Sequence, residues 1–370
     1  MSAGAVDNHL DACIEKITTA AYRIPTATPE SDGTADWDAT TMVAVHIRSA
    51  GQVGFGYTYA DVGTANVIEQ TLRPRLEGQD AGCIGALWAS MVAAVRNLGR
   101  RGVTSMAISA VDVALWDLKG KLMNRPVCSL FGEARRSVPV YGSGGFTSYS
   151  LEQLQKQLSG WTDGGIPRVK MKVGRDAAAD RQRVAAARAC IGDCELFVDA
   201  NGGYVRKQAL DFAQQFVDYG VTWFEEPVYH QDFEGLRLLR DRAPGSIEIA
   251  AGEYGYEGKY FREMLRAQAV DVLQADATRC GGFTGFMQAD SLALAEFLPL
   301  SSHCAPALHL HVACAAKQLR HMEYFYDHVR IESMLLDGVT PPESGHLAPD
   351  VSRAGIGLEL KSSDAQRFAL

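Results

Sequence analysis

Six short apolar runs in the middle of the chain each end in a polar residue, and these residues are almost evenly spaced. They lie 23 to 28 residues apart and are Lys172, Asp199, Glu225, Glu253, Asp276 and His303. A barrel of alternating strands and helices uses roughly 30 residues for each strand–helix unit. Each interval therefore fits one helix and the return to the next strand. Because the carboxyl ends of barrel strands form one rim, the six side chains are predicted to meet at a single site.

The pattern of the rest of the chain predicts a second domain in front of this barrel. Apolar–polar alternation typical of antiparallel strands comes first, and helical spacing follows it. The Pro/Gly/Asp-rich segment at 26–38 is predicted to be a loop between the first two strands. From 138, strands alternate with helices up to an eighth strand at 321–327. The fold class is thus α/β, with three parts: an α+β capping domain at 1–130, a barrel at 131–330 and a C-terminal segment at 331–370. The run GIGLEL near the C-terminus is expected to return to the cap as a strand.

The amino-acid composition argues against some classes of binding partner. The 370 residues carry a net charge of −8, with 47% hydrophobic and 22% charged residues, which is an ordinary globular composition. An acidic balance argues against nucleic acid. We see neither a secretory signal nor a run near the ~18 apolar residues of a membrane span, so a cytoplasmic location without membrane partners is expected, as is a homo-oligomer.

The eight cysteines form no C-x-x-C pair and are expected to be reduced, with Cys304 in a packing role.

Three of the six polar residues, Asp199, Glu225 and Glu253, are acidic and lie on consecutive strands. A single acid at a strand end is most often a cap or a surface charge. Three acids close together would repel one another without a cation. Oxygen ligands that leave positions open favour Mg²⁺ over Zn²⁺, so a magnesium site is predicted. The neighbouring Asn201 and Glu226 either support this site or are turn or surface residues.

Candidate acid–base groups lie on both sides of these carboxylates. Lys170 and Lys172 share one face of a strand, and each should lower the proton affinity of the other, which favours a lysine base. The alternative for Lys170 is a simple ion pair. On the other side, Asp276 is expected to orient His303 and raise its basicity. Glu323 on the eighth strand either accepts a hydrogen bond from substrate or stays buried and protonated. His309 and His311 are interpreted as helix residues.

These residues stand within longer motifs that carry a family resemblance. The motifs are KMK at 170–172, VDAN at 198–201, FEEP at 224–227, AAGE at 250–253, QADATRCGGFTG at 274–285, SSH at 301–303 and Glu323. Together they resemble the mandelate racemase subgroup of the enolase superfamily. The helix SAVDVALWDLKGK at 109–121 and the strand GFGYTY at 54–59 resemble the capping domain of that family.

The resemblance implies a modified (β/α)₇β barrel under an α+β cap. It implies Mg²⁺ on Asp199, Glu225 and Glu253, and acid–base roles for Lys172 and the His303–Asp276 pair on opposite faces of the substrate. Glu323 would hydrogen-bond an oxygen of the substrate carboxylate. The shared step of the family is removal of the proton α to a carboxylate, which gives an enediolate. By analogy we expect dehydration of a sugar acid to a 2-keto-3-deoxy acid. Racemisation or epimerisation, cycloisomerisation and a non-catalytic sugar-acid binder are the alternatives.

Specificity is expected to come from the loop at 25–37, the strand end at 54–60 and barrel residues at the mouth. Predicted substrate contacts are Thr26, Trp37, Tyr141, Ser143 and Asn201, with Tyr204 as a further candidate. The loop also offers hydroxyl partners at Thr28, Glu30, Ser31, Asp32 and Thr34, and its polarity favours a sugar acid over an aryl acid. The alternative is that this loop is a solvated surface turn.

Overall fold

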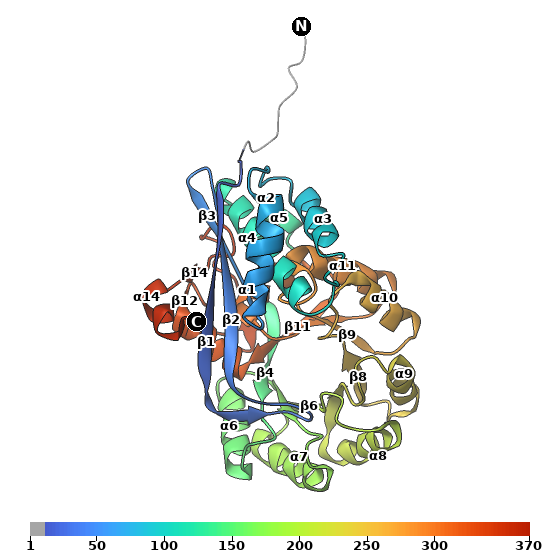
Figure 1. Ribbon diagram of the computed structural model, residues 1–370. Helices are drawn as coiled ribbons and strands as arrows, with labels where there is room; N and C mark the ends of the chain where they lie inside the picture. The colour runs from blue at the N-terminus through green and yellow to red at the C-terminus, as the bar shows by residue number, and fades with distance from the viewer. Residues whose placement is uncertain (1–11) are drawn as a thin grey trace.

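The computed structural model describes residues 12–370, and its centre is a closed barrel of eight parallel strands (Figure 1). The last strand pairs in parallel with the first, which closes the ring. The predicted α/β barrel with a cap is confirmed. The barrel strands are β4 (Val138–Gly144), β5 (Arg168–Lys172), β6 (Glu195–Asp199), β7 (Val221–Glu225), β8 (Glu248–Ala251), β9 (Val272–Ala275), β10 (Leu300–Ser302) and β11 (Leu319–Phe325).

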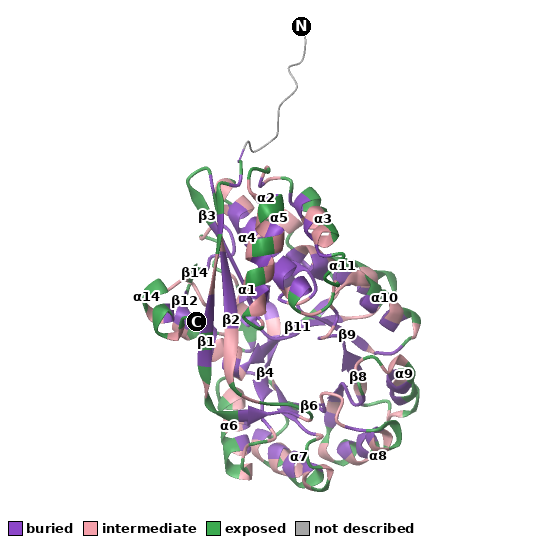
Figure 2. Ribbon diagram, viewed as in Figure 1, coloured by how far each residue is buried: buried purple, intermediate pink, exposed green. Residues whose placement is uncertain are grey.

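A helix follows each barrel strand and covers the outside of the barrel. Three of these helices, α6, α7 and α9, begin with a side-chain cap, and in α6 Ser150 and Gln153 cap each other's backbone in a reciprocal pair. Figure 2 shows the barrel strands buried and the helices exposed on their outer faces. The helices are α6 (Leu151–Asp163), α7 (Ala177–Ile191), α8 (Arg206–Phe216, continued by a 3₁₀ turn at Val217–Tyr219), α9 (Phe233–Arg242), α10 (Gly258–Arg266), α11 (Gly282–Ala295), α12 (Pro306–Ala315) and α13 (Tyr326–Leu335).

The cap is an antiparallel sheet with helices packed on one face. Its strands are β1 (Lys16–Ser31), β2 (Asp36–Ser49) and β3 (Gln52–Tyr59), and its helices are α1 (Gly63–Val67), a π-helical turn (Ile68–Leu72), α2 (Arg73–Leu76), α3 (Ile84–Ala94), α4 (Val103–Leu122) and α5 (Val127–Phe131). Helix α4 lies directly on β3. A Cβ at Gly56 would stand 2.3 Å from the carbonyl oxygen of Ala110. Only glycine permits this close approach, which explains the GFG run of β3.

The segment predicted to be a loop at 26–38 is mostly strand, so that prediction was wrong. β1 continues to Ser31 and β2 begins at Asp36, with an irregularity in the pairing between Pro25 and Glu30. The prolines are tolerated because β1 is an edge strand. In Figure 1 the resulting long hairpin runs along one side of the barrel, and its tip ends beside β6.

The C-terminal segment contains β12 (Leu336–Asp337), β13 (His346–Leu347), β14 (Glu359–Leu360), α14 (Ser362–Ala365) and a 3₁₀ turn (Gln366–Phe368). The strand in GIGLEL is β14, which pairs with β12, whereas the run meets the cap at Gly355, where the backbone forms a parallel bridge with Pro126. The next residue also contacts the cap: the backbone N–H of Ile356 donates to Asp117 of α4 at 2.7 Å. The boundaries assigned to the three parts stay a prediction.

Candidate active site

All six regularly spaced residues lie on one rim of the barrel. Lys172, Asp199 and Glu225 are the last residues of their strands. Glu253, Asp276 and His303 follow the ends of β8, β9 and β10 within two residues. All six are at most 6% exposed, so their charges interact through protein and not through bulk water.

The three carboxylates form a tight cluster. One oxygen each from Asp199, Glu225 and Glu253 lie within 4.8 Å of one another, close enough to hold a single metal ion. Burial and the charge of Asp199 raise the pKa of Glu225 to about 8, which is the sign of unrelieved repulsion. Oε2 of Glu253 is buried and has no hydrogen-bond partner among residues 12–370.

The charge balance of the rim also fits a divalent cation. The ion pairs of the rim join three cationic side chains to five carboxylates: Lys170, Lys172 and Arg279 to Asp199, Glu225, Glu253, Asp276 and Glu323. Glu226 is a sixth acid beside them, but burial and its acidic neighbours raise its pKa well above its usual value, so it is not counted as an anion. The carboxylates exceed the cations by two, and a divalent ion would balance that excess. Oxygen ligands of this kind suit Mg²⁺. The donor set, the spacing and the charge therefore agree with a magnesium site on Asp199, Glu225 and Glu253.

The two lysines are held by these carboxylates. Lys170 Nζ lies 2.7 Å from both carboxylate oxygens of Glu225 and 2.8 Å from Glu323, while Lys172 Nζ is 2.5 Å from Asp199. Burial and the charge of Lys170 each lower the pKa of Lys172, but the negative charges of Asp199, Glu253 and Glu225 together outweigh them and raise it. Lys170 does lower the proton affinity of Lys172, as expected, but the nearby anions dominate. The net lowering that would favour a lysine base is therefore not found in this arrangement.

On the opposite side, His303 is paired with Asp276. Nδ1 of His303 lies 2.8 Å from Oδ2 of Asp276, which leaves Nε2 toward the cavity, 3.4 Å from Glu253. Burial lowers the pKa of His303, but Glu253 and Asp276 outweigh it and raise the pKa overall. His309 lies on α12, as expected, and its Nε2 accepts the backbone N–H of Ala277.

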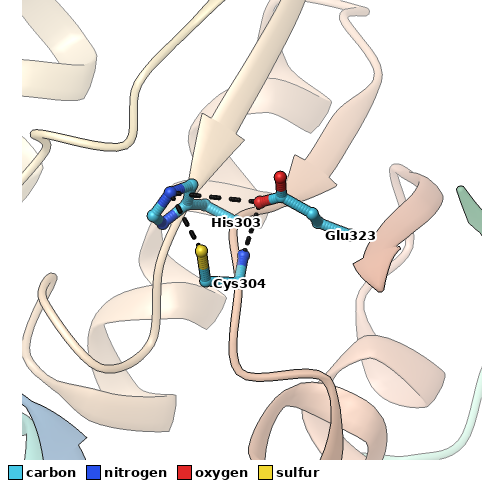
Figure 3. A group of neighbouring side chains, drawn as sticks. All are labelled: His303, Cys304 and Glu323. Atoms are coloured by element: carbon cyan, nitrogen blue, oxygen red, sulfur yellow. Dashed lines mark hydrogen bonds and ion pairs between the residues drawn. The ribbon is translucent and has the colours of Figure 1, made fainter. Parts of the chain in front are cut away.

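Cys304 and Glu323 complete this side of the site (Figure 3). The thiol Sγ of Cys304 is 3.2 Å from Nε2 of His303, and the backbone N–H of Cys304 donates to Glu323 at 2.7 Å. Cys304 and Ala305 both have positive φ, so the backbone turns sharply just after His303. Lys170 holds the pKa of Glu323 well below its usual range despite burial. An ionised Glu323 can only accept hydrogen bonds, and so can a substrate carboxylate. The predicted hydrogen bond between them therefore requires a proton on one of the two groups, and it stays a prediction.

The sequence reasoning missed Arg279. This residue lies in the quoted QADATRCGGFTG motif, but its role could not be read from strand spacing. Its Nη1 is 3.3 Å from Oε1 of Glu253, and its Nε is 3.6 Å from Asp276. It therefore ties the carboxylate cluster to the partner of His303.

A cavity of about 460 Å³ lies over these groups, between the rim and the cap. Lys172, His303 and Arg279 line it from the barrel, and Asn201 lines it beside β6. Of the predicted cap contacts, Trp37 and Asp32 also line it, while Thr26 and Thr28 do not. Thr34 reaches across and donates to the carbonyl oxygen of Asn201 at 3.2 Å.

Other predicted substrate contacts lie deeper. Tyr141 is completely buried inside the barrel, with its ring 5.3 Å from Nζ of Lys170. Ser143 is also fully buried and is not part of the cavity wall, and Tyr204 donates its hydroxyl to Asp180. Alternation along a strand predicts which face a side chain occupies but not its depth in the barrel.

Comparison with known proteins agrees with the fold and the site. The family described as "Enolase C-terminal domain-like" matches residues 153–365, and "Mandelate racemase / muconate lactonizing enzyme, N-terminal domain" matches residues 16–132. The chain belongs to the mandelate racemase group of the enolase superfamily. Similar members include the 3,6-anhydro-alpha-L-galactonate cycloisomerase of Streptomyces coelicolor, 34% identical over 96% of this chain and 99% of the relative. The L-talarate/galactarate dehydratase of Salmonella typhimurium is 32% identical over 84% of this chain and 81% of the relative.

Solved structures of this superfamily resemble the whole chain. A mandelate racemase/muconate lactonizing enzyme-like protein from Rubrobacter xylanophilus is 51% identical, with a TM-score of 0.95 over 97% of this chain and 100% of its own. A racemase from Streptomyces coelicolor with bound magnesium is 32% identical, with a TM-score of 0.91 over 96% of this chain and 100% of its own. The L-talarate dehydratase of Polaromonas, complexed with Mg and L-glucarate, is 31% identical, with a TM-score of 0.87 over 97% of this chain and 98% of its own. Magnesium is thus the metal of solved relatives, and this chain has a carboxylate cluster that can hold it.

Within the described residues, no helix is both long enough and apolar enough to span a bilayer.

Proposed function

We propose that this superfamily member removes the proton α to the carboxylate of a sugar acid and then dehydrates the substrate to a 2-keto-3-deoxy acid. The observation that carries the proposal is the placement of Lys172 and His303 on opposite sides of one carboxylate cluster, at the wall of one cavity. Relatives that act on sugar acids by dehydration support the choice of reaction.

The residues of this chain divide the work between the two sides. Lys172 or His303 takes the α-proton, depending on the configuration of the substrate. When bound, the divalent ion would supply positive charge that stabilises the enediolate and offsets Asp199, so that Lys172 could lose a proton. Asp276 keeps a proton on Nδ1 of His303, so Nε2 is the atom that exchanges protons with substrate. Once His303 is protonated at Nε2, it can give that proton to a departing β-hydroxyl group, which leaves as water.

The polarity of the cavity supports a hydroxylated substrate. Its wall includes the hydroxyl-bearing residues Thr40, Thr41, Tyr59 and Tyr254, together with Asn201. The hydroxyl of Tyr59 and Oδ1 of Asn201 are buried and have no hydrogen-bond partner among the described residues. They can hydrogen-bond sugar hydroxyls, whereas an aryl acid would leave them unpaired.

Cycloisomerisation is the second candidate. Two cycloisomerases of sugar-derived acids or lactones are among the relatives, at 34% and 31% identity. This reaction uses the same proton abstraction, and the enediolate then forms or opens a ring in place of expelling water.

A substrate screen tests the proposal. The purified protein with Mg²⁺ is incubated with aldonic, uronic and aldaric acids and their lactones and anhydro forms. Formation of a 2-keto acid with loss of 18 Da supports dehydration, and an unchanged mass with a new ring supports cycloisomerisation. If no acid loses its α-proton to solvent, the proposed function is wrong.

A further inference from the structure

The residues that line the cavity fall into two groups that differ in charge: those of the barrel rim, here called the barrel end, and those of the cap with the residues packed against them, here called the cap end. At the barrel end the cationic side chains that line it are Lys172 and Arg279. Lys172 is bound to Asp199, and Arg279 is held between Glu253 and Asp276. Both cations are therefore already balanced by rim carboxylates, before any substrate arrives.

The cap end carries acidic and neutral groups. Two acids line it, Asp32 in the hairpin turn and Asp61 just after β3. Oδ1 of Asp32 accepts the backbone N–H of Thr34 and Ala35, and Oδ1 of Asp61 accepts that of Gly63. These donors are neutral amides, and within residues 12–370 neither acid has a Lys, Arg or His within ion-pair distance. No Lys or Arg of the described cap residues lines the cavity.

Among residues 12–370, the one further basic side chain that lines this end is that of His328, and its contacts fit a neutral imidazole. Its ring stacks on Tyr59 with the centroids 3.6 Å apart, and its Nδ1 accepts the backbone N–H of Ala305. Burial and the neighbouring His303 lower the pKa of His328 to about 3. The hydroxyl of Tyr59 is buried and has no hydrogen-bond partner in the part of the chain that the structure describes. This end thus offers aromatic faces and an unpaired hydroxyl, which suit a neutral polyhydroxyl chain or ring.

We propose that the substrate is a monocarboxylate sugar acid, open-chain or carrying an internal ring, and not a dicarboxylate. The inference rests on the proposed function, because it places the single carboxylate at the metal end of the cavity. A second carboxylate among the cap residues would meet Asp32 and Asp61, and no cation of the described cap residues lines the cavity to balance it. An unpaired charge in a half-enclosed, like-charged site weakens binding by about 30-fold or more.

Matched pairs of acids test this inference. Each aldonate is compared with the aldarate of the same configuration, beginning with gluconate–glucarate and galactonate–galactarate, by kcat/KM with Mg²⁺. For every configuration that reacts, the aldonate should exceed its aldarate by about 30-fold or more. An aldarate that reacts as fast as its aldonate overturns the inference but leaves the proposed α-proton abstraction standing. If neither acid reacts, the proposed function fails. The ratio of the Kd of the aldarate to that of the aldonate, measured by calorimetry, then still decides whether the site prefers a monocarboxylate.

Charge variants locate the cause. In the double variant Asp32→Asn, Asp61→Asn both turns keep a side-chain oxygen acceptor, and the aldonate-to-aldarate ratio should narrow by about 10-fold. The control is Asp38→Asn in the same hairpin, whose side chain is 78% exposed, pairs with Arg23 and lies outside the cavity. The control should leave the ratio unchanged. An unchanged ratio in the double variant would overturn the assignment of these two acids.

Discussion

The barrel rim and the cap wall face each other across one cavity, but they satisfy their charges differently. On the rim, charged side chains pair with one another, as in Lys170 with Glu225 and His303 with Asp276. On the cap wall, Asp32 and Asp61 are bound by backbone N–H groups of their own turns. Changing one rim residue therefore unbalances several others, whereas the cap groups can vary one at a time. The difference suits a rim that performs one reaction and a cap that selects among substrates.

The largest effect is expected on the rim, from Glu253→Gln. Glutamine keeps an oxygen that can accept from Arg279, as Oε1 of Glu253 does at 3.3 Å, so the packing is preserved while the charge is removed. We expect kcat/KM to fall by about 10³-fold, because a divalent cation loses one of three anionic ligands. Activity, Mg²⁺ titration calorimetry and the urea midpoint measure this. Glu263→Gln on α10, exposed and paired with Lys259, is the control. Full activity of the Glu253 variant, or of chelator-treated enzyme, would contradict the metal assignment.

A smaller loss is expected from Asp276→Asn. The hydrogen bond to the Asp276 carboxylate raises the pKa of His303, so a neutral amide lowers that pKa. A base works above its pKa, and the acidic limb of the pH–rate profile should therefore move to lower pH. We expect kcat to fall about 100-fold as orientation is lost. Initial rates between pH 5 and 9 measure both effects. A lower rate with an unmoved acidic limb would mean that Asp276 serves only the fold.

On the cap side, Gly33→Ala should weaken substrate binding. A Cβ at Gly33 would stand 2.1 Å from the carbonyl oxygen of Ala200, so the hairpin tip could no longer rest on the barrel. We expect KM to rise about 10-fold with a smaller change in kcat. Gly85→Ala in α3, where a Cβ meets open space, is the matched control. An unchanged KM would show that the closed hairpin tip contributes nothing to binding.

The smallest effect is expected on stability, at the contact between the cap and the barrel helix α13. Glu332 of α13 accepts hydrogen bonds from the hydroxyl of Tyr57 in the cap and from the backbone N–H of Ala307. Burial raises the pKa of Glu332 from 4.5 to about 8. The folded protein thus holds this proton more tightly than the unfolded chain does. The stability it contributes is full below pH 4.5 and is lost as the pH rises toward 8.

The measurement is urea unfolding of the wild type and of Glu332→Gln at several pH values. The limiting slope from one such group is about 1.4 kcal/mol per pH unit. The wild type should lose more stability than the variant between pH 5.5 and 8. If the free energy of unfolding changed with pH in the same way in both proteins, ionisation of Glu332 would not destabilise the folded state.

The sequence predicted the rim far better than the cap. Rim residues follow directly from the ends of buried strands, and a barrel brings all such ends to one side. Strand spacing therefore located Asp199, Glu225 and His303 without any knowledge of the side-chain contacts. The depth of a side chain inside the barrel was harder to predict. Tyr141 points into the barrel, as alternation requires, but it is completely buried and does not line the cavity.

The cap was predicted less well because its local signals conflict with its tertiary contacts. Pro25 and Pro29 indicate a loop, but the backbone around them pairs as an edge strand. Arg279 was missed because it lies in a loop, where no periodicity marks a functional side chain. Its partners Glu253, Asp276 and the ring of Tyr254 follow the ends of the neighbouring strands β8 and β9, and they meet Arg279 only in the folded sheet.

Exchange of the α-proton with solvent tests the central claim most directly. Acids that react, or their epimers, are incubated in D₂O with Mg²⁺ and the wild type, Lys172→Ala or His303→Asn, and the α-proton signal is followed by NMR. If the two residues act from opposite faces, each variant should lose exchange for one configuration at the α-carbon, by about 10²-fold or more, and retain it for the other. Equal exchange of both configurations by both variants would contradict the account.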